Sequence, residues 1–321
     1  MKAFVLTLVA SFVLLHNFNT ASAATVTNFF TKFEPNEGYS TATNLDAQAG
    51  WISSGSGGNG IVTNFIAGQG QQAYIGFAPP APADDSLVVW RPINFNPITA
   101  GYPIVKFSVL MNIQDSQQGY WDIFRWSVYN IQGQRLFSID FDNDYRDVSY
   151  LLDGTNQVFL TYLPFVNNSN YTLNVTMNFA SNRWSATYNN ILIATNQPLT
   201  TVNAPLTLGD IDAVWLIHQL NNTNAPGDNY MLFDNYRITA ETLPVVPVTP
   251  AQVQFRSRTS EGWVWLRVFG ENNSRWALDA STNFVNWTVV KTNVISGTYA
   301  DVIDEGAAGL PRRFYRARYV P

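Results

Sequence analysis

The chain has 321 residues, no cysteine and a formal net charge of −5. The absence of cysteine excludes disulfides, thiolate metal sites and cysteine nucleophiles. Residues 24–249 carry 8 Lys and Arg against 17 Asp and Glu, whereas residues 250–321 carry 9 against 6. Because nucleic acids and anionic membranes repel an acidic surface, the composition argues against both as partners. It favours a neutral ligand such as a polysaccharide, or a bound cation.

The first residues have the pattern of an export signal. Lys2 precedes the apolar stretch AFVLTLVASFVLL, and TASAA offers small residues for cleavage after Ala23. The apolar stretch is too short to span a bilayer. We therefore expect residues 1–23 to be a signal peptide and the mature chain to be exported without membrane insertion. An exported protein of this size without disulfides is typical of bacteria. We therefore expect the mature chain outside the cell, on the bacterial cell surface or in the periplasm.

Short alternating segments separated by Gly, Pro, Asn and Thr fill the rest of the chain, and this pattern predicts an all-β fold. In Tyr171–Phe179, apolar residues alternate with Thr and Asn, as in a strand with one buried face. The segment IQGQ, between two strand-like segments, predicts a hairpin turn. Three prolines in residues 243–252 indicate a linker. The sequence thus predicts a large β-sandwich domain at residues 24–242 and a small one at residues 253–321.

Motifs near both ends of the large domain carry a resemblance to a known fold family. FEPNEGYS, followed by LDAQAGWISSG, begins at Phe33, and FDNYRIT ends just before Ala240. With these motifs, residues 33–240 resemble a concanavalin A-like jelly roll. The resemblance implies a sandwich of two sheets in which the first and last strands lie close together.

The same resemblance implies a calcium ion held by one carboxylate near each end of the domain, and Glu34 and Asp234 occupy the matching positions. A carboxylate on a largely apolar strand is costly unless it is paired or binds a metal, which also favours an ion at Asp234. The alternative is that Asp234 and Asn235 form a β-bulge and hydrogen-bond to local amides. In either case the role is structural.

The C-terminal region contains the segments WALDAST from Trp276, NWT from Asn286 and RFYR from Arg313. With these segments it resembles a C-terminal module of exported proteins from Verrucomicrobia-like bacteria. The resemblance implies a small sandwich of the fibronectin or immunoglobulin type and supplies no reaction. We expect Trp276, Trp287 and Phe314 to lie in the core, because so small a domain must bury its few large side chains.

Catalytic chemistry has one weak candidate. Asp140, Asp142 and Asp144 are spaced so that their carboxylates share one face of a strand. Jelly-roll glycosidases use a similar Glu-x-Asp-x-Glu arrangement, and a retaining mechanism needs two carboxyl groups about 5–5.5 Å apart. Here both outer residues are Asp, and the flanking sequence differs from that family. Asp140 and Asp142 are therefore weak catalytic candidates, and the sequence leans against an enzyme.

Strand alternation also assigns a polar face to which a glycan could bind. Its carboxylate, amide, imidazole and guanidinium groups can recognise sugar hydroxyls, and aromatic residues at its rim can stack on sugar rings. The predicted ligand-binding residues are Tyr120, Trp121, Arg125, Asp140, Asp142, Asn178 and His218. The alternative is an ordinary solvated outer sheet, because half the strand positions of any sandwich are polar.

These observations predict an exported, non-catalytic protein that binds a polysaccharide or cell-surface glycan and carries a structural calcium ion. Two alternatives stay open. One is a divergent glycoside hydrolase or polysaccharide lyase on the same fold, and the other is a purely structural cell-surface protein.

Overall fold

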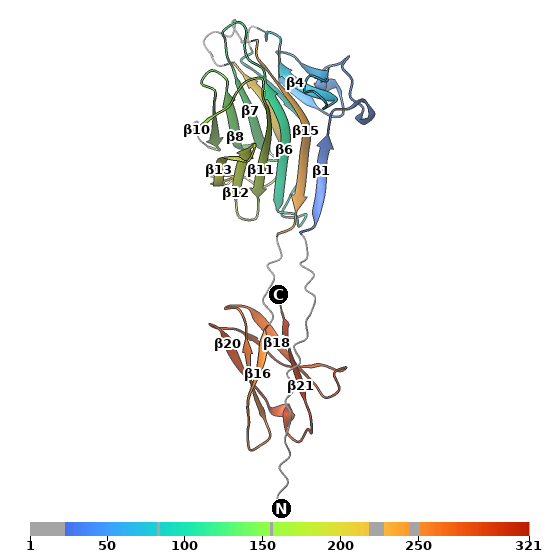
Figure 1. Ribbon diagram of the computed structural model, residues 1–321, viewed down its shortest axis with the longest axis vertical. Helices are drawn as coiled ribbons and strands as arrows, with labels where there is room; N and C mark the ends of the chain where they lie inside the picture. The colour runs from blue at the N-terminus through green and yellow to red at the C-terminus, as the bar shows by residue number, and fades with distance from the viewer. Residues whose placement is uncertain (1–22, 82–83, 155–156, 218–227, 244–250, 321) are drawn as a thin grey trace, which may run out of the picture. The chain divides into compact units, whose positions relative to one another are not determined.

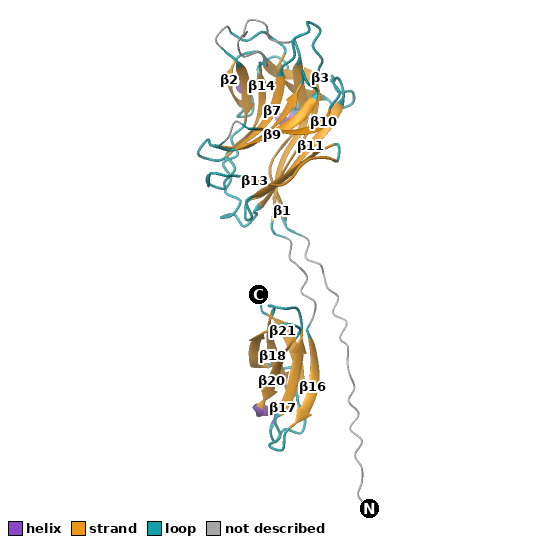
Figure 2. Ribbon diagram, turned by 90° about the vertical axis from the view of Figure 1, so that its left-hand side faces the viewer, coloured by secondary structure: helices purple, strands orange, loops and turns teal. Residues whose placement is uncertain are grey.

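The computed structural model describes residues 23–81, 84–154, 157–217, 228–243 and 251–320, and nearly all their regular structure is β-strand (Figure 2). The predicted signal peptide, apart from Ala23, and most of the predicted linker lie outside these ranges. Within them, no helix is long and apolar enough to cross a membrane. One compact unit comprises Ser22–Pro244, and a second contains Val245–Pro321.

The first unit contains an eight-stranded antiparallel sheet (Figure 1). Seven of its strands follow the order β13-β12-β11-β6-β15-β4-β3, and β1 pairs with β15. The strands are β1 (Thr25–Thr31), β3 (Asn59–Thr63), β4 (Gln71–Gly76), β6 (Ile104–Ile113), β11 (Asn170–Asn178), β12 (Arg183–Tyr188), β13 (Ile191–Pro198) and β15 (Tyr230–Glu241). Two short 3-10 helices, η1 (Pro35–Glu37) and η2 (Leu45–Ala47), follow β1.

The second layer of this unit is a seven-stranded antiparallel sheet with the order β10-β9-β8-β7-β14-β5-β2. Its strands are β2 (Ile52–Gly55), β5 (Ser86–Trp90), β7 (Ile123–Tyr129), β8 (Arg135–Asp142), β9 (Asp147–Leu152), β10 (Val158–Pro164) and β14 (Asp210–Leu216). The central strand β14 joins the sheet between β7 and β5, which precede it in the chain by about eighty residues or more. Such non-local pairing is what makes this topology a jelly roll rather than a set of simple hairpins.

Apolar side chains from both sheets form one core between them. Trp126 of the seven-stranded sheet packs against Phe107, Phe233 and Tyr236 of the eight-stranded sheet, with ring centroids 5.4, 5.5 and 6.2 Å apart. The alternation predicted for Tyr171–Phe179 is confirmed, since Leu173, Val175 and Met177 are buried between exposed Thr and Asn residues. The buried face of each strand therefore sets which of its polar residues point outward.

The first and last strands of the unit pair, as the resemblance implies. β1 runs antiparallel to β15, with Thr25 opposite Glu241 and Thr31 opposite Tyr236 (Figure 1). Earlier in β15, residues 230–233 pair with β4 instead. Asp234 lies where β15 changes from β4 to β1, and its register against β6 shifts between Asp234 and Arg237. A β-bulge is therefore present at Asp234 and Asn235, and Asn235 has a φ of +52°.

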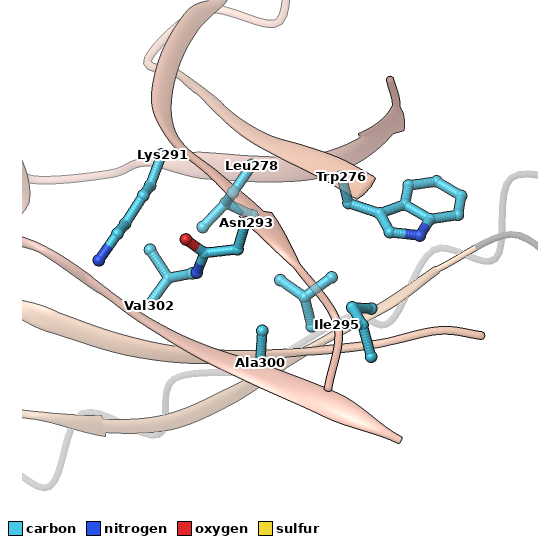
Figure 3. A pocket seen from close by; sticks show the side chains of 8 residues that line it. Trp276, Leu278, Lys291, Asn293, Ile295, Ala300 and Val302 are labelled. Atoms are coloured by element: carbon cyan, nitrogen blue, oxygen red, sulfur yellow. The ribbon is translucent and has the colours of Figure 1, made fainter. Parts of the chain in front are cut away.

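The second unit is a small β structure of two three-stranded sheets. One sheet contains β16 (Gln252–Arg258), β17 (Val264–Phe269) and β20 (Tyr299–Asp304), and the other contains β18 (Arg275–Ser281), β19 (Thr288–Val294) and β21 (Phe314–Tyr319). A 3-10 helix, η3 (Glu305–Ala307), follows β20. Trp276, Leu278, Ile295 and Val302 are buried in its core (Figure 3). The predicted core position is confirmed for Trp276, whereas Trp287 and Phe314 are only half-buried and are not part of the core cluster.

Candidate functional site: an acidic groove on the seven-stranded sheet

A groove of about 340 Å³ lies on the outer face of the seven-stranded sheet. Its lining combines two aromatic residues, two acidic residues and small or aliphatic residues, namely Ser54, Val88, Trp90, Tyr129, Gly133, Asp210 and Asp212. The volume falls at the lower end of the range of small-ligand sites, roughly 300–1000 Å³. The cavity in the core of the second unit is much smaller, about 10 Å³ (Figure 3), which is room for at most one water.

The strand register places the acidic and aromatic residues at one end of the sheet. On the central strand β14, Ile211, Ala213 and Trp215 are part of the core, so Asp210 and Asp212 point outward. Asp210 is paired with Tyr129 and Asp212 with Ser127, both on β7. On the other side of β14, Ala213 is paired with Val89, which places Trp90 beside Asp212.

Two features of the chain hold this end of the sheet together. Gly209 approaches the backbone so closely that a Cβ there would lie 2.3 Å from the carbonyl oxygen of Asn130, so only glycine fits before Asp210. The predicted IQGQ turn is confirmed: the Asn130 N–H donates to the Gln134 carbonyl at 2.9 Å, and Gly133 has a φ of +72°. This turn joins β7 to β8 and brings Gly133 to the groove.

Asp210 and Asp212 form a hydrogen-bonded carboxyl pair. Asp212 is 6% exposed, and its Oδ1 atom has no hydrogen-bond partner among the residues that the structure describes. Burial, together with the charge and hydrogen bond of Asp210, raises the pKa of Asp212 to about 9. Burial also raises the pKa of Asp210. Because two adjacent carboxylates repel one another, the pair holds a proton at neutral pH.

The predicted residues Arg125 and Asp140 lie next to the groove on the same outer face. Arg125 Nε donates to Asp140 Oδ1 at 2.6 Å, and Nη2 donates to Oδ2 at 2.8 Å. Burial alone would lower the pKa of Arg125, but the hydrogen bonds and charge of Asp140 raise it. The pair is direct and bidentate, so each side chain satisfies the other.

The remaining predicted residues are not gathered at the groove. Asp142 Oδ1 accepts the backbone N–H groups of Asp144 and Tyr145 in the turn after β8. Tyr120 is 40% exposed and Trp121 donates its indole N–H to Asp115, both before the start of β7, whereas Tyr129 is at its end. Neither aromatic residue lines the groove.

The prediction of one polar face fails at Asn178. This residue ends β11 in the eight-stranded sheet, on the opposite layer from Arg125 and Asp140, and its side chain accepts the backbone N–H of Ser181. Strand alternation predicts which side chains of a strand point outward, but it does not predict which sheet the strand joins. The outward faces of the two sheets lie on opposite sides of the sandwich. His218 lies outside the described residues.

Asp210, Asp212, Trp90 and Tyr129 were missed by the sequence analysis. A signal was present: GDIDAV places two carboxylates two residues apart on an otherwise apolar strand, so both face the same way. What the sequence does not contain is the pairing of β14 with both β7 and β5, which brings the two aromatic residues to the two acidic ones.

The predicted metal ligands Glu34 and Asp234 do come close together. Burial, with a contribution from the charge of Glu34, raises the pKa of Asp234 to about 7. Asp234 Oδ1 accepts the Asn235 N–H at 2.6 Å, and Glu34 Oε1 accepts the Gln71 N–H at 3.2 Å. Within the described residues, no group of three or more His, Cys, Asp or Glu side chains is arranged to hold a metal. An ion here would therefore need backbone carbonyl or water oxygens as well.

No family model and no curated protein sequence matches the chain. Among solved structures, a sialidase is similar over 59% of this chain and 17% of its own, with 9% identity and a TM-score of 0.41. The CBM2 module of an evolved Dit protein from Lactobacillus casei BL23 phage J-1 is similar over 70% of this chain and 100% of its own, with 9% identity and a TM-score of 0.45.

Arcelin-5, a lectin-like defence protein of Phaseolus vulgaris, is similar over 69% of this chain and 100% of its own, with 8% identity and a TM-score of 0.43. At this level of similarity these structures say nothing about a ligand of this chain. The predicted fold class is confirmed by the strand order itself: the protein is all-β, with a lectin-like jelly-roll sandwich and a small additional β unit. The family predicted for the small unit stays a prediction.

Proposed function

We propose that this chain is an exported, non-catalytic protein that binds a glycan in the acidic groove of the seven-stranded sheet. The observation that carries the proposal is the placement of Trp90 and Tyr129 beside the outward carboxyl groups of Asp210 and Asp212. Aromatic rings provide apolar faces on which sugar rings stack, and carboxylates accept hydrogen bonds from sugar hydroxyls. Export rests on the signal-like first 23 residues.

The carboxyl geometry favours binding over hydrolysis. Asp210 and Asp212 are neighbouring carboxyl groups on one strand that hold a proton between them, whereas the two carboxyl groups of a retaining glycosidase lie on either side of the scissile bond, about 5–5.5 Å apart. The weak catalytic candidate Asp140 has both oxygens bonded to Arg125 and is 4% exposed. Asp142 accepts backbone N–H groups in a turn. Neither arrangement leaves a carboxyl group positioned to attack or protonate a sugar in the groove.

Replacing Trp90 with Ala should weaken glycan binding at least tenfold, which corresponds to about 1.4 kcal/mol, because the sugar loses its aromatic contact. Calorimetric titration of the mature chain with a panel of oligosaccharides measures this. Trp90→Phe should recover part of the affinity. Phe77→Ala is a matched control, because Phe77 is a 64% exposed aromatic residue outside the groove. Equal affinity in the wild type and Trp90→Ala would contradict the proposed site.

We further propose that Glu34 and Asp234 hold a structural calcium ion. The support is chemical: Asp234 is a fully buried carboxyl group whose pKa is raised by burial and by neighbouring Glu34, so a cation beside both would relieve an unfavourable burial. By binding both carboxylates, the ion would bridge Glu34, which follows β1, and Asp234, which is at the bulge of β15.

Calcium at one hundred times its dissociation constant should stabilise the first unit by about 2.7 kcal/mol, or roughly 5–10 °C in melting temperature. Asp234 must be ionised to bind the ion, so the gain should increase as pH rises through 7. Thermal melts with calcium and with a chelator measure this. Asp234→Asn should abolish the response, whereas Glu241→Gln on the same strand should keep it. An identical melt with and without calcium would leave Asp234 with only its bulge role.

A further inference from the structure

The groove carries negative charge that nearby Lys or Arg side chains do not neutralise. None of its lining residues is Lys or Arg, while two are Asp. The nearby cations are engaged elsewhere. Arg125 is paired with Asp140, and Arg135 donates to the Leu152 carbonyl at 3.3 Å. Arg91 donates to the Ala49 carbonyl at 2.9 Å and lies over the Phe29 ring.

Asp212 gives a second and independent indication of a ligand. Its carboxyl group is more than nine-tenths buried and lines the groove, yet Oδ1 accepts no hydrogen bond within the described protein. A buried acceptor without a hydrogen-bond partner is unfavourable, because it has lost its bonds to water and gained none in return. Because the described residues supply no donor to this atom, a donor carried by a ligand is the direct way to satisfy it.

The aromatic walls suit a positive charge as well as a sugar ring. Trp90 and Tyr129 line the groove together with both Asp residues, and the faces of Trp and Tyr rings attract ammonium groups. An ammonium group also has three donors and no acceptor, which matches a site that offers carboxyl oxygens.

We propose that the groove selects a glycan bearing a free, protonated amino group, such as an oligomer of glucosamine, over neutral and acidic glycans. The inference rests on the proposed glycan-binding function and names its ligand class. In the free protein a shared proton relieves the repulsion between Asp210 and Asp212. In the complex the ligand ammonium takes over that role and donates to the free Asp212 oxygen, and the shared proton is released to the solvent. Uronic acid oligomers are excluded, because their carboxylates would face the pair.

The test is calorimetric titration of the mature chain at pH 6 with four oligosaccharides of equal length. The four are a glucosamine oligomer, its N-acetylated counterpart, a neutral glucose oligomer and a galacturonate oligomer. Acetylation removes the charge and leaves the sugar ring, so the first two probes isolate the amino group. The glucosamine oligomer should bind at least tenfold more tightly than the other three, and added salt should reduce this preference.

Two variants locate the effect. Asp210→Asn should lower the affinity for the glucosamine oligomer at least tenfold more than it lowers the affinity for the neutral oligomer, because Asn removes the charge and keeps a hydrogen-bonding side chain. Glu305→Gln, which removes an exposed negative charge from the other compact unit, should change neither affinity. A melting curve for each variant verifies folding, and removal of one of two repelling carboxyl groups is not expected to destabilise the sheet.

The possible failures are distinguishable. Equal or tighter binding of the neutral or N-acetylated oligomer would overturn the amino-group selectivity and leave the glycan-binding proposal intact. A preference for glucosamine that survives in the Asp210→Asn, Asp212→Asn double variant would also overturn it. If none of the four oligomers bound, both this inference and the proposed function at the groove would be overturned.

Discussion

Replacing Arg125 with Ala is expected to destabilise the first unit by about 3–5 kcal/mol, because it leaves the Asp140 carboxylate buried without its partner. The Asp140 side chain is 6% exposed, and both of its oxygens accept hydrogen bonds from Arg125. For a unit of this size the loss corresponds to a decrease of roughly 6–20 °C in melting temperature. Thermal and urea unfolding of the mature chain measure it.

Two comparisons separate the charge effect from a general loss of packing. Lys106→Ala removes a cross-strand ion pair with Glu241 whose lysine is 47% exposed, and it should cost no more than about 1 kcal/mol. The double variant Arg125→Met, Asp140→Leu removes both charges and should recover most of the loss. If Arg125→Ala destabilises no more than Lys106→Ala, the pair is not the buried ion pair described above.

Replacing Asp212 with Asn is expected to stabilise the protein, increasingly so as the pH rises. An unfolded Asp ionises near pH 4, whereas folded Asp212 keeps its proton to about pH 9. Its contribution to stability is therefore full below pH 4 and is lost as the pH rises from about 4 to 9. The slope is at most about 1.4 kcal/mol per pH unit. Asn does not ionise, so the free energy of unfolding of the variant should not decrease in this way as the pH rises.

The pH dependence of stability at Asp212 also depends on the titratable and charged groups near it. Its partner Asp210 carries the nearest charge, and Tyr129 on β7 and Tyr236 on β15 both experience the charges of the pair. Arg125 and Arg135 act on Tyr129, and Arg91 acts on Tyr236. Thermal melts of the wild type and Asp212→Asn from pH 4 to pH 9 measure the difference in their stability. A constant gap across that range would contradict the raised pKa of Asp212.

This destabilising pair is itself an argument for function. The raised pKa of Asp212 predicts that the pair weakens the fold at neutral pH, and Asn at either position would remove the repulsion. Groups with strongly perturbed pKa values in a cleft are typical of functional sites, where stability is given up for chemistry or binding.

The sequence predicted the local structure well because that structure depends on neighbouring residues. Alternation in Tyr171–Phe179 identified the buried face of β11, and IQGQ identified the turn between β7 and β8. The motifs at the ends of the domain predicted that β1 and β15 pair, which places Glu34 near Asp234.

The site was predicted less well because it depends on strands that are distant in the chain. Arg125 and Asp140 were correctly placed on one outward face, since β7 and β8 form a hairpin and their outward residues must meet, but neither lines the groove and their role in binding stays a prediction. Asn178 was assigned to the wrong face, because nothing local indicates that β11 joins the other sheet. Trp90, Tyr129 and Asp212 come from three strands whose order in the sheet, β7-β14-β5, is not their order in the chain.

The most direct test of the central claim is a crystal structure of the mature chain with a glycan that it binds. We predict a sugar ring over Trp90, with donors within hydrogen-bond distance of Asp210 and Asp212. A sugar bound instead to the outer face of the eight-stranded sheet or to the second unit, with the groove occupied only by water, would contradict the claim.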